Sequence, residues 1–334
     1  MAGLTERIQG LFRSSGLFRL ILVFLAIAFA RHAAAQEPPA PTLRVSVNRV
    51  NVGATVTSSG GKFVEGLRAS DFHVFDNGVE QRITDFLSLD EPAQVVLMLE
   101  CGPSMFLFRH ENILKADALI SSLAASDRVA IACYSSGPDV KLDLTADQIT
   151  SRQTLRQLNF RSGSGELNLS SSLFSVFDWL SNVPGKKTIV LLSSGVDSAP
   201  PKNADAFQKA LSASDVRVLV VSTSKELRKF PKKDKHSFDE REDRAIVKTV
   251  LSEGDRTLRN LATATGGRVY FPKNSNEYEK VYTEIARLVR HEYSLAFVPQ
   301  LQDGKTHTLT VRANHFWYRV DHRQAYLAPL AAPN

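Results

Sequence analysis

The sequence predicts an α/β protein with a second, smaller part made of strands. From residue 94 onward, short apolar runs alternate with stretches of helical periodicity. The segments before residue 91 and after residue 292 instead alternate apolar and polar side chains, as half-buried strands do. The chain has 334 residues, 43% of them hydrophobic and 23% charged, which is ordinary for a globular protein of more than one domain.

The middle of the chain has the pattern of a parallel sheet. Apolar runs bounded by turn residues predict buried strands at residues 95–99, 128–134, 188–192, 216–221 and 268–271, with 140–144 antiparallel to 128–134. Helical spacing predicts helices at 104–123, 145–158, 169–180, 205–212, 258–265 and 276–291. Strands alternating with helices form a mostly parallel sheet. Ligands bind such sheets at the carboxyl ends of the strands, where Glu100 and Ser104 follow the first strand.

Both ends of the chain indicate short strands. Residues 43–47, 50–56, 293–298, 306–313 and 318–326 have the β-like pattern. The tripeptide Asp76-Asn77-Gly78 is a strong signal for a type I′ hairpin turn. The N-terminal β segment is too short to bury a core alone, so we expect it to pair with the C-terminal strands in one β domain.

The N-terminus has the three-part pattern of a secretory signal. Arg7, Arg13 and Arg19 precede the apolar run 20–30, and the small residues 33–35 provide a cleavage site. The alternative is a membrane anchor, but the 11 apolar residues fall short of the roughly 20 that cross a bilayer. We therefore expect export to the periplasm, the cell surface or the medium, with no stable membrane span after cleavage.

These patterns predict six segments. They are a signal peptide at 1–35, a linker at 36–42, a β segment at 43–91, the α/β domain at 92–291, a C-terminal β segment at 292–328 and a tail at 329–334. Within the α/β domain, residues 225–244 are almost wholly polar, with nearly balanced charges. This composition predicts a solvated insertion on the ligand-facing edge, where contact with a partner is possible.

The charge and the cysteines exclude two classes of function. Four arginines and one glutamate lie in the predicted signal, which lowers the net charge of the remaining chain from +6 to +3. So weak a basic balance gives no case for nucleic-acid binding, which needs a concentrated basic patch. Cys101 and Cys133 are the two cysteines, and without clustered histidines they do not make a zinc site.

Export makes a disulfide between the two cysteines chemically possible. We expect two buried thiols instead, because Cys133 lies inside a strand and can point to the wrong face of the sheet. A free Cys101 thiol at a strand-to-helix turn would permit a thiol-dependent enzyme. However, no histidine base can be placed beside it, and the chain has neither a G-x-S-x-G elbow nor a phosphate-binding loop. We expect no catalysis.

Several motifs resemble a known family. They are GGKFVEGLRASDFHVFDNG, VVLMLECGPSM, NVPGKKTIVLLSSG, LRNLATATGGRVYFP, HEYSLAFVP and RVDHRQAYLAP, in this order between about residues 43 and 328. The α/β part resembles a von Willebrand factor type A (VWA) domain, and the whole chain resembles the secreted VWFA-related acidobacterial domain family. The resemblance implies a Rossmann-like VWA domain, with a mostly parallel central sheet flanked by helices, plus a small β domain from the N- and C-terminal strands. It also implies protein binding at a divalent-ion adhesion site.

In that family the first strand ends in D-x-S-x-S, whose Asp and Ser oxygens hold Mg²⁺ with a Thr and an Asp from two further loops. Here Glu100 stands at the Asp position, Gly102 at the first Ser and Ser104 at the second. The Thr position falls on Leu167, between Glu166 and Asn168, and the last Asp position on Ser194, three residues before Asp197. Glycine and leucine offer no side-chain oxygen, whereas Mg²⁺ needs near-ideal oxygen ligands.

The leading hypothesis is an exported, non-catalytic protein-binding or adhesion protein with a degenerate ion site and no cofactor. Its partner, a protein of unknown identity, would contact the loops that carry Glu100, Gly102, Ser104, Glu166, Asn168, Ser194 and Asp197. The alternative is a metal-dependent adhesin in which Glu100, Ser104 and Asp197 still hold Mg²⁺ and bind a partner carboxylate. A thiol-dependent enzyme at Cys101 is a second alternative.

Overall fold

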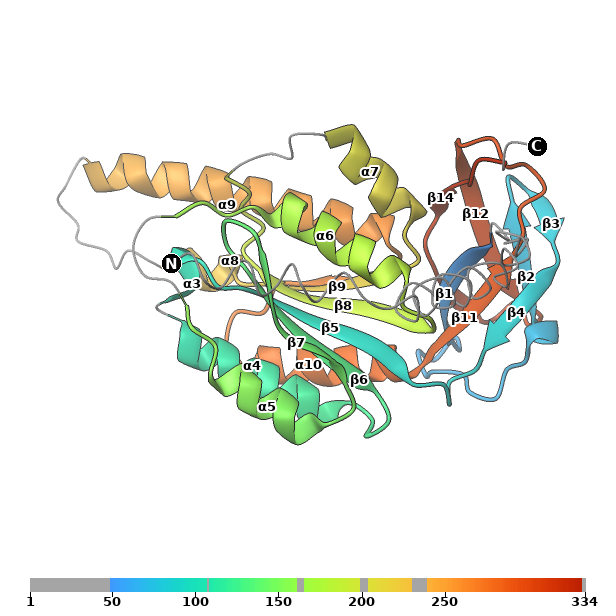
Figure 1. Cartoon of the computed structure of the whole chain (residues 1–334), viewed down its shortest axis with the longest axis horizontal. Coiled ribbons are helices and arrows are strands. Elements are labelled where there is room, and N and C mark those ends of the chain that lie inside the picture. Colours follow the sequence, from blue (N-terminus) through green and yellow to red (C-terminus); the bar gives the residue numbers. More distant parts are fainter. Residues whose placement is uncertain (1–48, 107, 161–164, 199–203, 230–238, 332–334) are drawn as a thin grey trace, which may run out of the picture. The chain divides into compact units, whose positions relative to one another are not determined.

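A six-stranded sheet forms the centre of the α/β domain (Figure 1). The computed structural model describes residues 49–106, 108–160, 165–198, 204–229 and 239–331. The sheet has the order β10-β9-β8-β5-β6-β7. Its parallel strands are β5 (Ala93–Glu100), β6 (Arg128–Tyr134), β8 (Lys186–Ser193), β9 (Arg217–Ser222) and β10 (Val269–Tyr270), while β7 (Pro138–Thr145) is antiparallel to β6.

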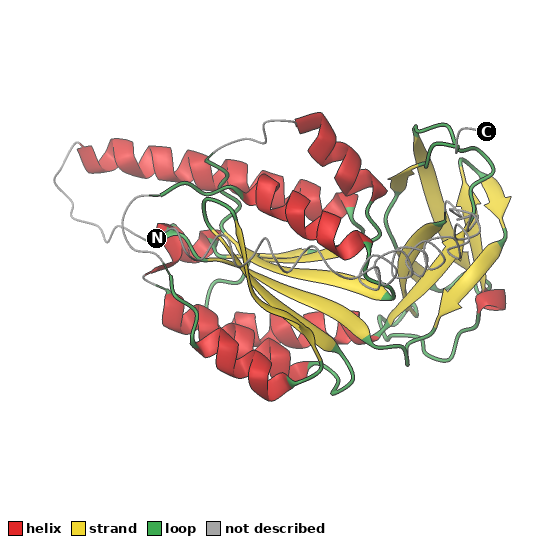
Figure 2. Ribbon diagram, viewed as in Figure 1, coloured by secondary structure: helices red, strands yellow, loops and turns green. Residues whose placement is uncertain are grey.

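Helices cover both faces of this sheet (Figure 2). One face packs against α4 (Arg109–Ser122), α5 (Gln148–Arg156) and α10 (Ser275–Arg290), and the other against α6 (Leu169–Ser181), α7 (Ala204–Ala213) and α9 (Asp239–Ala264). Successive side chains of a strand point to opposite faces. In β5, accordingly, Val95, Leu97 and Leu99 enter the first core, and Val96 and Met98 the second. Two short helices, α3 (Pro103–Phe106) and α8 (Ser224–Leu227), follow β5 and β9 at their carboxyl ends.

The β domain combines strands from both chain ends in two four-stranded antiparallel sheets. The first has the order β13-β1-β11-β4, from β13 (Arg319–Asp321), β1 (Val50–Thr57), β11 (Glu292–Phe297) and β4 (Ile83–Leu87). The second has the order β14-β12-β2-β3, from β14 (Ala325–Leu327), β12 (Thr306–Ala313), β2 (Phe72–Asp76) and β3 (Val79–Gln81). The one-turn helix η1 (Ala69–Asp71) leads into β2. Strand residues of both chain ends share one core, which includes Val52, Val74, Leu295, Phe297 and Leu309.

The fold class expected from the sequence is therefore confirmed: a mostly parallel α/β domain with a β domain built from both ends. The hairpin between β2 and β3 is confirmed as well. Its two central residues, Asn77 and Gly78, have φ of 48° and 82°. Two positive φ values are what a type I′ turn requires, and Asn and Gly adopt them at low cost.

Three elements differ from expectation. The helix expected at 104–123 is divided into α3 and α4, and Phe108 between them leaves helical geometry. The strand expected at 318–326 is also divided, because the chain crosses from the first sheet to the second between β13 and β14. The helix expected at 258–265 extends back to Asp239, so part of the polar stretch 225–244 belongs to α9 rather than to a loop.

The predicted signal peptide and linker, residues 1–42, lie outside the described residues and stay predictions, as does the expected strand at 43–47. The described part belongs to one compact unit, residues 47–334. None of the helices described has both the length and the apolar character needed to cross a membrane.

Candidate functional site

Three loops meet at the carboxyl ends of β5, β6 and β8, where the sequence placed the candidate site. The first follows Glu100, the last residue of β5, the second precedes α6, and the third follows β8. Backbone hydrogen bonds hold the second loop on both sides: Ser198 N of the third loop donates to Leu167 O over 2.7 Å, and Asn168 N donates to Ser135 O, in the turn after β6, over 2.7 Å. We call this the top face of the sheet. The structure thus brings together loops separated by up to 98 positions in the sequence.

The Glu100 side chain is turned into the protein, with 1% of its surface exposed. Its Oε2 accepts hydrogen bonds from Ser194 N and Ser194 Oγ, both over 2.7 Å, and from Tyr134 Oη over 3.1 Å. Hydrogen bonds to a carboxylate are short and about twice as strong as those between neutral groups. Glu100 therefore ties the end of β5 to the loop after β8, a bridging task that a metal ion performs in the resembled family.

Tyr134 extends this network to a neighbouring serine. Its hydroxyl lies 2.7 Å from Ser193 Oγ, which in turn accepts a hydrogen bond from Gly195 N over 2.8 Å. Burial raises the pKa of Tyr134 well above its ordinary value, and the charge of Glu100 raises it further. The phenol consequently keeps its proton, which is what it needs in order to donate to Glu100.

Gly102 and Leu167 fill the place where the resembled family has two hydroxyl ligands. A Cβ atom added to Gly102 would lie 2.4 Å from Leu167 Cδ2. Leu167 is buried and belongs to the core on the α6 side of the sheet. Glycine at position 102 thus leaves the room that Leu167 occupies, and the contact between the two loops is apolar.

The remaining predicted site residues lie around this centre. Asp197 Oδ2 accepts from Ser170 N over 3.0 Å and from Ser170 Oγ over 2.5 Å, and Asn168 Nδ2 donates to Ser136 O over 2.7 Å. Glu166 is exposed, and Ser104 lies in α3. In the described part of the chain, Asp197 Oδ1 and Asn168 Oδ1 are buried oxygens without a hydrogen-bond partner.

The side chains at the centre do not fit an octahedral Mg²⁺ ion. Mg²⁺ requires several oxygen ligands at about 2.1 Å. Glu100 already accepts three protein hydrogen bonds, Gly102 supplies no oxygen, and Leu167 presents a methyl group. Within the described residues, no three His, Cys, Asp or Glu side chains gather in a way that could hold a metal ion. Among the described residues of this site, Asp197 Oδ1 and Asn168 Oδ1 are the buried side-chain oxygens that accept no hydrogen bond.

Cys101 and Cys133 form a disulfide, so the expectation of two free thiols is wrong. Leu99 lies opposite Cys133 in the parallel pairing of β5 with β6. Cys101, two positions after Leu99, therefore points to the same face as Cys133. Their Cα atoms are 5.5 Å apart, within the usual range for a disulfide. The sulfur that a thiol-dependent enzyme would need is thus already bonded.

The sequence reasoning missed the contributions of Tyr134 and Ser193. Tyr134 ends a strand and lies opposite Glu100 in the register of β5 with β6. A polar aromatic residue at the end of an otherwise apolar strand was the available signal. The sequence contained no such signal for Ser193, because Ser193 comes close to Tyr134 only in the folded structure. A hollow of about 300 Å³ adjoins this part of the top face and is lined by the disulfide, Tyr134 and the loop that leads into β7.

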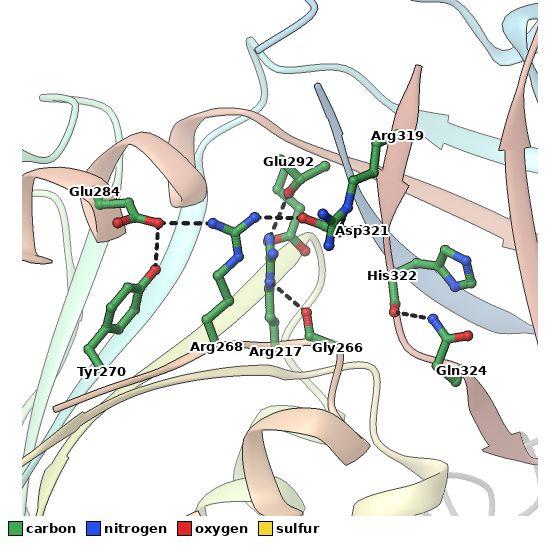
Figure 3. A network of polar contacts seen from close by, with 11 residues as sticks. Arg217, Gly266, Arg268, Tyr270, Glu284, Glu292, Arg319, Asp321, His322 and Gln324 are labelled. Carbon is green, nitrogen blue, oxygen red and sulfur yellow. Dashed lines mark hydrogen bonds and ion pairs between the residues drawn. The ribbon is translucent and has the colours of Figure 1, made fainter. Parts of the chain in front are cut away.

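A second polar cluster lies at the opposite edge of the sheet, where the parallel strands begin, beside the β domain (Figure 3). Arg268 lies between Glu284 and Asp321, bonding to them over 2.9 and 2.5 Å. Burial alone would raise the pKa of Asp321, but the hydrogen bond and charge of Arg268 hold it below its ordinary value. An open groove of about 1160 Å³ runs along these residues. Arg268 is paired with an acid of α10 on one side and an acid of β13 on the other. We therefore interpret the cluster as a connection between the α/β domain and the β domain.

No family model matches the chain, and no curated protein matches it by sequence. Similar solved structures include a von Willebrand factor type A protein from Catenulispora acidiphila, with TM-score 0.43 and 11% identity over 84% of this chain and 75% of that one. Another is the conserved hypothetical protein BatB from Bacteroides thetaiotaomicron, with TM-score 0.40 and 15% identity over 59% and 99%. A third is an aerotolerance-related membrane protein from Bacteroides fragilis, with TM-score 0.40 and 17% identity over 58% and 98%. The chain resembles VWA domain proteins, and at these identities the likeness concerns the fold alone.

Proposed function

We propose that the chain is an exported, non-catalytic binding protein whose top face recognises a protein partner without a metal ion. The observation that carries this proposal is the closure of the site around Glu100. One buried carboxylate oxygen accepts from Ser194 and Tyr134, while Leu167 fills the space over Gly102. A site built in this way holds its loops in place with protein groups alone, so the ion is not needed to form the surface.

The surface offered to a partner consists of what remains exposed around this closed centre. Glu166, Ser136 and Ser198 are exposed side chains on three neighbouring loops of the top face. The same loops are fixed by the backbone bonds at Ser135, Leu167 and Asn168. A pre-organised surface loses less conformational entropy on binding than a mobile one. Binding rather than catalysis rests on the family resemblance, which is a fold-level analogy, and export rests on the signal pattern of residues 1–35.

The metal-dependent adhesin remains the second candidate because of two specific atoms. Asp197 Oδ1 and Asn168 Oδ1 are buried, have no hydrogen-bond partner among the described residues, and lie on adjoining loops. Buried polar atoms without partners are uncommon and call for an explanation, of which a bound water or cation is one. A cation there would need Glu100 to give up its hydrogen bonds in order to join it.

Calorimetric titration of the full chain with Mg²⁺ and Mn²⁺ separates the two candidates. The metal-free proposal expects no binding heat at millimolar ion. Binding that is lost in both Glu100→Gln and Asp197→Asn would instead establish the adhesin. Glutamine keeps an acceptor for Ser194, so Glu100→Gln tests the charge while preserving most of the network.

Capture of partners from the native cell envelope tests the surface itself. We expect the set of captured proteins to be the same with and without chelator and to be reduced in Glu166→Arg. Glu279→Arg, the same charge reversal at another exposed glutamate, on α10, is the matched control and should capture as the unmodified chain does. Equal capture by both variants would place the binding surface elsewhere.

A further inference from the structure

The turn between β12 and β13 presents aromatic side chains to solvent. Phe316 is 92% exposed and Trp317 is 48% exposed. No other large apolar side chain in the described part of the chain is as exposed as Phe316. We call His315, Phe316, Trp317 and Tyr318 the aromatic tip. A single exposed apolar residue needs no explanation, but consecutive aromatic rings at the end of a turn do.

The aromatic tip is held in a fixed arrangement. The rings of His315 and Trp317 stack at 4.8 Å between centroids, and Phe316 meets Trp317 edge-on at 4.8 Å. Tyr318 N donates to His315 O over 3.0 Å, which closes the turn, and the Tyr318 ring packs against the core of the β domain. The aromatic surface is therefore pre-organised, and binding would cost little conformational entropy.

Asn314 anchors the base of the aromatic tip to the neighbouring segment. Its backbone N donates to Asp71 O over 2.9 Å, and its Nδ2 donates to Ser70 O over 3.1 Å. Its Oδ1 lies 2.8 Å from His73 Nε2. The tip consequently stands on η1 and β2 rather than on a free loop.

The charged side chains next to the aromatic tip along the chain are basic. Arg312 and Arg319 flank it, both exposed, and the sequence between them contains no acidic residue. Three acidic side chains lie near its base: Asp71 accepts from Arg68 N, Glu80 bonds His73, and Asp321 bonds both Arg268 and Arg319. The surface thus combines projecting aromatic rings with cationic side chains.

We propose that the aromatic tip inserts into the surface of a membrane that contains anionic lipids. Phe316 would enter the boundary of the acyl chains, Trp317 would lie at the headgroup level, and Arg312 and Arg319 would contact lipid phosphates. Aromatic rings and basic side chains are the residues that favour this interface. The proposal does not depend on the top face, and the two surfaces lie in different domains.

The dimensions of the aromatic tip favour a lipid surface over a protein partner. Aromatic residues that dominate protein interfaces lie at the centre of broad patches of about 800 Å² on each side. The exposed apolar residues Leu301 and Leu330 are near the other end of β12, whose eight residues span about 25 Å. Phe316 therefore projects without a broad apolar patch around it. This shape suits insertion into a lipid surface better than docking on a protein.

Fluorescence of Trp317 in the full chain provides the test. The chain has two tryptophans, so a Trp179→Phe background leaves Trp317 as the reporter. Vesicles of phosphatidylcholine alone are compared with vesicles that also contain phosphatidylglycerol. We expect a blue shift of the Trp317 emission and quenching by brominated acyl chains, both stronger with phosphatidylglycerol and weaker at high salt. Because the residues before 49 contain no tryptophan, their own affinity for lipid does not produce this signal.

Two variants decide whether the aromatic tip is responsible. Phe316→Ser should weaken partitioning at least about tenfold, the loss expected when one aromatic ring leaves an apolar environment. Ile149→Ser, which removes another strongly exposed apolar side chain on α5, should leave it unchanged. The proposal is overturned by the absence of any Trp317 shift with either vesicle. It is equally overturned by equal losses in the two variants, or by a shift that follows protein concentration without lipid, which would indicate a second copy of the chain.

Discussion

The two edges of the six-stranded sheet hold their neighbouring segments by different chemistry. At the top face, one carboxylate accepts hydrogen bonds from a serine and a tyrosine, a disulfide joins the residue after β5 to β6, and a leucine packs on a glycine. At the opposite edge, the beginnings of β8 and β9 carry buried cations that meet the β domain. Arg217 bonds Glu292 over 3.3 Å and Thr55 over 2.8 Å.

The opposite edge contains further pairs of the same kind. Lys187 Nζ lies 2.8 Å from Asp215, whose other oxygen accepts from Asn51 of β1 over 2.8 Å. Arg323 donates to Ser214 O and Asn51 O, and burial lowers its pKa to about 10. Buried ion pairs stabilise a fold little compared with apolar residues, but they impose a geometry. We infer that this edge fixes how the two domains meet, whereas the top-face contacts described above are hydrogen bonds to one carboxylate, a disulfide and an apolar contact.

Of the substitutions that test this contrast between the two edges, loss of Arg217 should lower the stability most. Arg217→Met leaves the Glu292 carboxylate buried without its cation, and we expect a loss of about 3–5 kcal/mol in the free energy of unfolding. Urea unfolding measures it. In the double variant Arg217→Met/Glu292→Leu, apolar side chains replace both charges, and most of the loss should be recovered. A loss below about 1 kcal/mol in the single variant would mean that water reaches Glu292.

The Arg217–Glu292 pair also predicts the direction in which pH changes the stability of Arg217→Met. Burial raises the pKa of Glu292 above its ordinary value of 4.5 even beside Arg217, and removal of the arginine raises it further. A raised folded-state pKa means that the folded protein holds the proton more tightly than the unfolded chain. The deficit in the free energy of unfolding of Arg217→Met relative to the unmodified chain should therefore be smallest below about pH 4.5 and should grow as the pH rises through the folded-state pKa of Glu292. An equal deficit at pH 4.5 and 7.5 would contradict this account.

Removal of the disulfide should have the next largest effect, at the other edge. The bridge closes a sequence separation of 32 residues, for which chain entropy gives about 3–4 kcal/mol. We expect Cys101→Ala/Cys133→Ala to lose about this much, measured by urea unfolding under oxidising conditions. Reductant should lower the stability of the unmodified chain similarly and leave the double variant unchanged. If reductant changes neither protein, the covalent closure of the top face is not a source of stability.

The sequence predicted the layers of the fold better than it predicted the state of the site. Apolar runs such as 95–99 and the Asp76-Asn77-Gly78 turn depend on local periodicity and local backbone geometry, which one chain displays directly. The pairing of both chain ends also followed from a physical need, because the N-terminal segment could not bury a core alone. These features did not require knowledge of which side chains touch.

The site required such knowledge. Glu100 and Ser194 were both named from the sequence, but their hydrogen bond depends on the approach of loops that are 94 positions apart. The disulfide was misjudged because the relative register of β5 and β6, which puts Cys101 and Cys133 on one face, is not written in either strand. The contact of Leu167 with Gly102 was unpredictable for the same reason. The sequence showed that each residue departs from the family pattern, but it did not show that the two residues fit together.

That complementarity can be measured as a coupling, and its effect should be the smallest of the three. Gly102→Ala places a Cβ where Leu167 Cδ2 now lies, and the crowding should cost about 1–2 kcal/mol. Leu167→Val shortens the side chain and should cost about 1 kcal/mol through lost contact. In Gly102→Ala/Leu167→Val the added methyl enters the space that the shorter side chain vacates, so the double variant should lose less than the two single losses combined. Urea unfolding of the four proteins gives the coupling, and simple additivity would show that Leu167 does not need the space that glycine leaves.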